Sequence, residues 1–138
     1  MPLQMGDIIL NGKYTIQRLL GRGSYGNVWL AVDHLSGGRR VAIKELRQDE
    51  VTPEQFADGV KRFEREALIG TQPRHPHIVK VYTVEQVGPD RLLVLEYVDG
   101  ESLRQRLDRE GALPVDEAVR ITVESCRALE AVRQHTQM

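Results

Sequence analysis

A glycine-rich segment at residues 21–26 (GRGSYG) does most to limit what this 138-residue chain can fold into. In a dinucleotide-binding fold, G-x-G-x-x-G opens a helix whose N-terminus receives the phosphate. Here residues 27–33 alternate, with Val28, Leu30 and Val32 on one face, which predicts a strand instead. No Gly-Lys-Ser/Thr closes the motif, so a Walker A loop is also excluded. Two interpretations remain: a glycine-rich hairpin that covers nucleotide phosphates, or a plain glycine hairpin between two strands.

A lysine in the next alternating segment shifts the balance between these interpretations. Residues 41–46 place Lys44 on the same face as the small Ala42, an unusual position for a solvated lysine. A lysine on a sheet face beside a glycine loop can bind phosphate oxygens if an acid holds it. The alternative is an edge-strand lysine that keeps the sheet soluble. Together, the glycine loop and Lys44, each in a strand context, favour nucleotide binding.

The remaining periodicity predicts an α+β fold. Strands are expected over residues 14–20, 27–33, 41–46, 78–87 and 91–98, with glycine-containing turns at 34–40 and 88–90. Thr52 offers an N-cap with Gln55 three residues later, and an apolar stripe follows, so a helix is expected there. Gly59 leaves open whether that helix is one piece or two. Neighbouring strands on hairpin connections favour an antiparallel sheet with the helix packed against it.

Two further helices are expected after residue 100. A short polar one covers residues 102–110 and a longer one covers residues 114–133. The inner stripe of the longer helix consists of Ala118, Ile121, Ser125, Ala128 and Val132. Cys126 lies near this stripe and is interpreted as a small core residue.

Composition excludes several functional classes. Nineteen Lys and Arg residues against 20 Asp and Glu residues give a net charge of −1. A dedicated nucleic-acid or anionic-membrane binder should be visibly basic, so both are disfavoured. A single cysteine cannot form an internal disulfide, and no apolar run reaches transmembrane length. We therefore expect a soluble, cytoplasmic domain with no membrane segment in these residues; an anchor beyond residue 138 stays open.

Five motifs in order resemble the protein kinase family. After the glycine loop and the VAIK segment at 41–44 come FEREA at 63–67, HPHIV at 75–79 and LVLEYVDG at 93–100. From about residue 11 onward, the chain is similar to the N-terminal lobe of a bacterial eukaryotic-like (Hanks-type) serine/threonine kinase. The resemblance implies a five-stranded antiparallel sheet with one helix, the C-helix. It also implies an N-terminal extension at 1–13, an ATP-binding lobe at 14–100 and the first helices of an incomplete second lobe at 101–138.

The resemblance also implies site residues for ATP. The apolar roof over adenine would consist of Leu20, Val28 and Ala42. Backbone groups of Glu96 and Val98 would bind the adenine edge, with Leu95 behind it as gatekeeper. The residues over the phosphates would be Gly21, Gly23, Ser24 and Gly26. Lys44 would contact the α- and β-phosphates and Glu66 would hold Lys44. Ser102 falls where relatives often have a polar residue near the ribose.

Periodicity does not distinguish Glu66 from Glu64, so the choice of Glu66 rests on the family pattern. Gly70 departs from that pattern, because many relatives have a larger apolar residue there, and this leaves open how firmly the helix is held. His75 and His77 could be metal ligands, but a turn around Pro76 is the favoured interpretation, and no metal site is predicted.

The sequence lacks the catalytic segments of the family. No His-Arg-Asp or Asp-Phe-Gly occurs in the 138 residues, although the family's catalytic base and Mg²⁺ ligands belong to these segments. We therefore expect the ATP-binding part of a kinase that transfers the γ-phosphate to protein Ser/Thr, inactive as the isolated chain. The alternative is a stand-alone regulatory module that binds nucleotide or docks on a kinase. Partners would be ATP, a protein substrate, or a copy docked through the sheet, the C-helix or the last helix.

Overall fold

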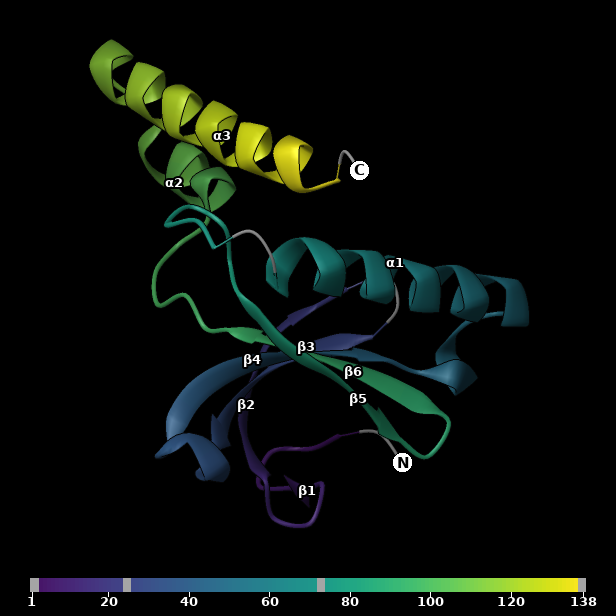
Figure 1. Ribbon diagram of the computed structural model, residues 1–138. Helices are drawn as coiled ribbons and strands as arrows, with labels where there is room; N and C mark the ends of the chain where they lie inside the picture. The colour runs from purple at the N-terminus through teal and green to yellow at the C-terminus, as the bar shows by residue number, and fades with distance from the viewer. Residues whose placement is uncertain (1–2, 24–25, 72–73, 137–138) are drawn as a thin grey trace.

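The computed structural model describes residues 3–23, 26–71 and 74–136. A sheet with one helix on its face forms the larger part, and two further helices lie beyond one end of it (Figure 1). The strands and α-helices are, in chain order, β1 (Ile8–Ile9), β2 (Tyr14–Arg22), β3 (Asn27–Asp33), β4 (Arg39–Leu46), α1 (Pro53–Thr71), β5 (Val81–Val87), β6 (Asp90–Glu96), α2 (Leu103–Glu110) and α3 (Val115–Thr136).

Over the described residues the sheet is antiparallel and has six strands in the order β1-β2-β3-β4-β6-β5, so the expected count of five is wrong. The additional strand, β1, has only two residues, and it pairs Ile8 with Thr15 and Ile9 with Tyr14. Two residues are too few to produce a detectable alternation, which is why the periodicity of the sequence does not reveal β1. The other strands lie where the sequence predicts them, with differences at their ends: β2 continues to Arg22, β4 begins at Arg39, β5 begins at Val81 and β6 ends at Glu96.

Helix α1 covers one face of the sheet. Thr52 and Gln55 form the expected capping box, because each backbone N–H donates to the other residue's side chain. The helix continues through the buried Gly59 as one piece. Phe63, with Phe56 and Val60 beside it, packs on an apolar cluster of sheet residues on the α1 side: Leu46, Val81, Leu93 and Leu95.

The N-terminal segment covers the opposite face. Leu3 is buried in a second cluster together with Tyr14, Ile16 and Trp29, and Ile9 and Leu10 pack against it. Backbone bonds fasten the segment to β2: the N–H of Gly6 donates to the carbonyl of Ile16, and the N–H of Ile16 donates to the carbonyl of Asp7. Residues 3–10 are therefore packed on the sheet, with Leu3 buried in its core.

Helices α2 and α3 are joined by charge pairs and expose much of their surface. Ser102 caps α2 in a capping box with Gln105, and Arg106 of α2 forms a two-pronged ion pair with Glu117 of α3. Ala128 is buried in α3, but Ser125 and Cys126 are exposed, which contradicts their assignment to the inner stripe and core. The contact stripe of α3 is narrower than its apolar periodicity indicates. Within the residues described, no helix is both long and apolar enough to cross a membrane.

A buried carboxylate on the N-terminal side of the sheet predicts a pH effect. Glu45 accepts a hydrogen bond from the Trp29 indole at 2.8 Å. Burial raises the pKa of the Glu45 carboxyl above its ordinary value of 4.5, against the opposing effects of Trp29 and Arg47. Because the folded chain binds this proton more tightly, the stabilisation is complete below about pH 4.5 and is lost as the pH rises through the raised pKa.

Glu45→Gln should remove this pH dependence. We expect the free energy of unfolding of the variant, relative to the wild type, to increase between pH 4.5 and 8 in urea denaturation. Glu64→Gln, a change at an exposed glutamate of α1, is the matched control for the loss of one surface charge. A Glu45→Gln difference that is constant over this pH range would contradict the prediction.

Candidate functional site

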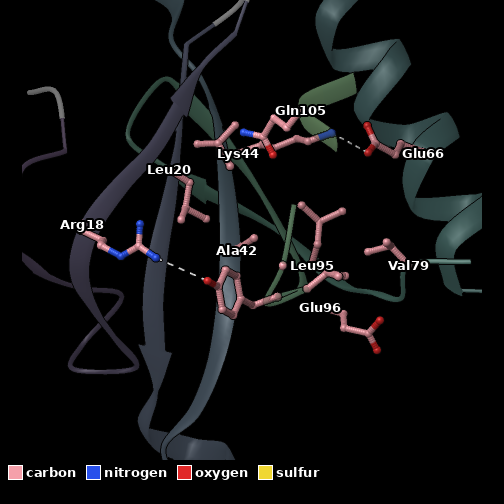
Figure 2. A pocket seen from close by; sticks show the side chains of 13 residues that line it. Arg18, Leu20, Ala42, Lys44, Glu66, Val79, Leu95, Glu96 and Gln105 are labelled. Atoms are coloured by element: carbon pink, nitrogen blue, oxygen red, sulfur yellow. Dashed lines mark hydrogen bonds and ion pairs between the residues drawn. The ribbon is translucent and has the colours of Figure 1, made fainter. Parts of the chain in front are cut away.

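A cleft of about 510 Å³ opens between the sheet, α1 and the segment that links β6 to α2 (Figure 2). This volume lies in the range of about 300–1,000 Å³ that is usual for small-molecule sites. Apolar side chains from strands form much of its wall, and polar groups lie at its ends. The lining residues are Arg18, Leu20, Val28, Ala42, Lys44, Glu66, Val79, Leu95, Glu96, Tyr97, Val98, Gly100 and Gln105.

Strand register places the wall residues side by side. In an antiparallel sheet, directly paired residues project to the same face. Ala42 pairs with Leu95, and Lys44 pairs with Val28. Ala42 and Lys44 are two residues apart in β4, so they also share that face. The lysine therefore lies at the end of an apolar surface, as the alternation of residues 41–46 predicts.

Lys44 forms an ion pair with α1. Its Nζ donates to Glu66 Oε1 at 2.8 Å, and Figure 2 shows the two side chains meeting across the end of the cleft. Periodicity does not distinguish Glu64 from Glu66 as the partner of Lys44. In the structure the partner is Glu66, and Glu64 is exposed. Each side chain of the pair is 40% exposed, and an ion pair this accessible to water adds only about 0–1 kcal/mol to stability.

The glycine-rich turn adjoins this ion pair. Gly23 and Gly26 line a neighbouring hollow of about 260 Å³ together with Lys44 and Glu66. The turn is closed by the N–H of Gly23, which donates to the carbonyl of Gly26 at 2.7 Å. Gly26 lies against β4, where an added Cβ would be 2.4 Å from the carbonyl oxygen of Glu45. Ser24, also predicted as a site residue, lies outside the described residues.

The linker after β6 forms the other end of the cleft. Glu96 ends β6 and its N–H donates to the carbonyl of Lys80 at 2.8 Å. Val98 follows in the linker and is exposed. Of the predicted site residues that the structure describes, Gly21 and Ser102 line neither the cleft nor the neighbouring hollow, and Gly23 and Gly26 line only the hollow. The Ser102 hydroxyl accepts a hydrogen bond from the N–H of Gln105 in the α2 cap, and it is Gln105 that reaches the cleft.

Five lining residues are absent from the sequence-based prediction: Arg18, Val79, Tyr97, Gly100 and Gln105. Arg18 Nη2 donates to Tyr97 Oη at 3.4 Å, which brings β2 and the linker together at the cleft entrance. A register shift in β2 between Ile16 and Arg18 turns Arg18 toward the cleft, whereas regular alternation from Ile16 would place it on the opposite face, so the alternation of the sequence does not indicate Arg18. The linker residues carry no periodic signal either.

A strand lysine paired with a glutamate on the helix, beside a glycine-rich β-hairpin, defines the N-terminal lobe of a protein kinase. Comparison with known families agrees: the protein kinase domain family matches residues 14–137, and the chain belongs to this family. Its relatives are bacterial serine/threonine-protein kinases. The chain is 40% identical over 124 residues to PkaB of Streptomyces coelicolor and 34% identical over 126 residues to PrkC of Bacillus subtilis. These alignments cover 88% and 91% of the chain but only 28% and 19% of the relatives.

The fold comparison leads to the same family. The kinase domain of M. tuberculosis PknI superposes with a TM-score of 0.76 at 29% sequence identity. The match covers 97% of the chain and 52% of that kinase domain. The chain is therefore similar to about half of a bacterial kinase domain, the half that contains the N-terminal lobe.

Proposed function

We propose that the cleft binds ATP and that the chain is the ATP-binding part of a protein serine/threonine kinase. The observation that carries this proposal is the Lys44–Glu66 ion pair at 2.8 Å, located where an apolar wall meets the glycine-rich turn. A purine needs an apolar slot with a few polar groups at its edge, and a triphosphate needs a fixed cation and close backbone approach.

The apolar end of the cleft suits adenine. Leu20, Val28 and Ala42 would cover one face of the base, and Leu95 would limit its depth. Because the N–H of Glu96 already donates to Lys80, the carbonyl is the backbone group that Glu96 could offer to the base. Val98 in the linker would supply the second backbone group, as its family position implies. Near the ribose, Gln105 is better placed than Ser102, whose hydroxyl caps α2.

The polar end suits the phosphates. Lys44 would bind the α- and β-phosphates, with Glu66 holding its ammonium group in place. The turn that includes Gly21, Gly23, Ser24 and Gly26 would lie over them, because glycines let the backbone approach a ligand closely. Phosphate binding would use local positive charge, which is compatible with a net charge of −1 for the whole chain.

Metal binding and phosphoryl transfer need residues from elsewhere in a kinase. Among the residues described, no group of three or more His, Cys, Asp or Glu side chains could hold a metal ion. The family's Mg²⁺ ligands and catalytic base belong to the His-Arg-Asp and Asp-Phe-Gly segments, which this sequence does not contain. We therefore propose that these residues bind ATP, and that transfer of the γ-phosphate to protein Ser/Thr is a property of a kinase that includes both lobes.

Removing the lysine tests the proposal. Calorimetric titration of Mg·ATP into the chain should give measurable binding, and Lys44→Ala should weaken it at least about tenfold, equivalent to about 1.4 kcal/mol. Lys61→Ala is the control, because Lys61 is an exposed lysine of α1 that does not line the cleft. Equal affinity of Lys44→Ala and the wild type would remove Lys44 from the site, and absence of binding by the wild type would refute the proposed function.

A further inference from the structure

Helix α1 comes into unusually close contact with the sheet near its C-terminal end. Gly70 is buried there against Val81, the first residue of β5. A Cβ at Gly70 would lie 2.2 Å from Val81 Cγ2, 2.9 Å from Val81 Cβ and 3.1 Å from the Val81 backbone nitrogen. The γ-methyl group of Val81 therefore occupies the space that any side chain at position 70 would need.

A side-chain rotation cannot relieve this conflict. Turning Val81 about χ1 would move its γ-methyl groups but leave its Cβ and backbone nitrogen in place, both within 3.1 Å of the added atom. Relief to an ordinary contact distance requires the helix and the strand to separate by about 1 Å. Val81 also pairs with Leu95, a wall residue of the cleft, so a displacement of β5 would reach the same site.

The separation would act on the ion pair, because Gly70 lies one helical turn after Glu66. Residues four apart in a helix share a face and are about 6 Å apart along the axis. Lys44 and Glu66 are each 40% exposed, so their attraction is too weak to hold the helix against a steric conflict. An outward shift of about 1 Å would stretch their 2.8 Å contact beyond hydrogen-bond distance.

We propose that Gly70 is a positioning residue for Lys44. Its missing side chain lets α1 approach β5 until the helix backbone meets Val81, and this contact sets the distance at which Glu66 meets Lys44. Where many relatives have a larger apolar side chain, this chain has Gly70, and the β-branched side chain of Val81 occupies the space instead. The consequence for nucleotide affinity rests on the proposed ATP site, whereas the consequence for Lys44 does not.

The ion pair can be observed directly by NMR of the chain labelled with [13Cε]lysine. The sequence contains four lysines, Lys13, Lys44, Lys61 and Lys80, so the spectrum is simple and Lys44→Arg identifies the Lys44 signal. Glu66→Gln defines where that signal lies without the ion pair. Gly70→Ala should move the signal at least halfway from its wild-type position toward its position in Glu66→Gln. Leu68→Ala, a truncation of an exposed side chain on the same turn, should leave it unchanged.

An exchange of the two side chains separates positioning from stability. In Gly70→Ala/Val81→Gly the methyl group at position 70 no longer meets a side chain at position 81. The 3.1 Å contact of the added Cβ with the backbone nitrogen of residue 81 remains, and a shift of a few tenths of an ångström relieves it. The double variant should be less stable than the wild type, because the core loses Val81, yet its Lys44 signal should return most of the way to the wild-type position. If Gly70 acted only through stability, the Lys44 signal would follow stability instead. The loss of Val81 in the exchange variant would then move the signal further from its wild-type position. A folded Gly70→Ala with an unshifted signal, or a folded exchange variant with the signal of Glu66→Gln, would overturn the proposal.

Titration with Mg·ATP links the result to the cleft. Gly70→Ala should bind at least threefold more weakly than the wild type, and the exchange variant should recover to within twofold. If the wild type binds no ATP while the lysine signals behave as expected, the proposed function fails and the positioning role stands. A shifted Lys44 signal without loss of ATP affinity would overturn the link between Gly70 and nucleotide binding.

Discussion

Deletion of residues 3–10 is expected to lower the free energy of unfolding by roughly 3–5 kcal/mol, a large part of the roughly 5–15 kcal/mol of a typical domain. The deletion removes Leu3 from the core and exposes Trp29 on the face opposite α1. It also leaves the backbone N–H and carbonyl of the buried Ile16 without their partners, Asp7 and Gly6. Both effects act in the same direction.

Urea denaturation followed by tryptophan fluorescence would measure this loss, because Trp29 is the single tryptophan and lies under the segment. Leu3→Ala should account for part of the effect, about 2–3 kcal/mol. Met5→Ala, which truncates a side chain that is 72% exposed, should change stability by less than about 0.5 kcal/mol. If the deletion variant unfolds at the same urea concentration as the wild type, the segment does not belong to the core.

Gly26→Ala is expected to destabilise the lobe by about 2–4 kcal/mol, through overpacking and an unfavourable backbone conformation. An added Cβ would lie 2.4 Å from the Glu45 carbonyl oxygen and 3.1 Å from its carbonyl carbon. These atoms belong to the backbone of β4, so no side-chain movement can make room. Gly26 also has a φ of +155°, which L-residues rarely adopt. The start of β3 must therefore move away from β4.

Gly21→Ala provides the matched control in the same glycine-rich segment, at a position within β2. Nothing lies within 4 Å of the position that its Cβ would take, so we expect a change of less than about 0.5 kcal/mol. Thermal or urea unfolding of both variants gives the comparison. Equal stabilities of Gly21→Ala and Gly26→Ala would show that contact with β4 does not select glycine at position 26.

Local signals made much of the fold predictable. The Thr52–Gln55 capping box, the Gly37-Gly38 hairpin and the alternation around Lys44 each depend on residues within a few positions of one another. The two-residue strand β1 has no such pattern, since its pairing with β2 exists only in the folded chain. The exposure of Cys126 likewise depends on how little of α3 touches the lobe.

The residues of the candidate site likewise fall into two groups: those that local sequence patterns indicate and those that depend on the folded chain. Ala42 and Lys44 follow from strand alternation, and Leu95 joins them through the register of β4 with β6, which the family resemblance anticipated. The choice of Glu66 over Glu64 depends on the rotation of α1 about its axis, which packing across the sheet determines. Gln105 lines the cleft because the linker after β6 places α2 beside it, and no periodicity in the sequence indicates this placement.

The strand order has a consequence for how the lobe assembles. Every neighbouring pair in the sheet is joined by a short hairpin connection except β4 and β6, between which α1 and β5 intervene. Loop closure over a long segment costs more entropy and slows folding, so this pairing is the demanding step. It is also the step that brings Ala42 beside Leu95. The meander of β1 to β4 and the hairpin of β5 and β6 can therefore form early, but the cleft exists only once these two parts have joined around the helix.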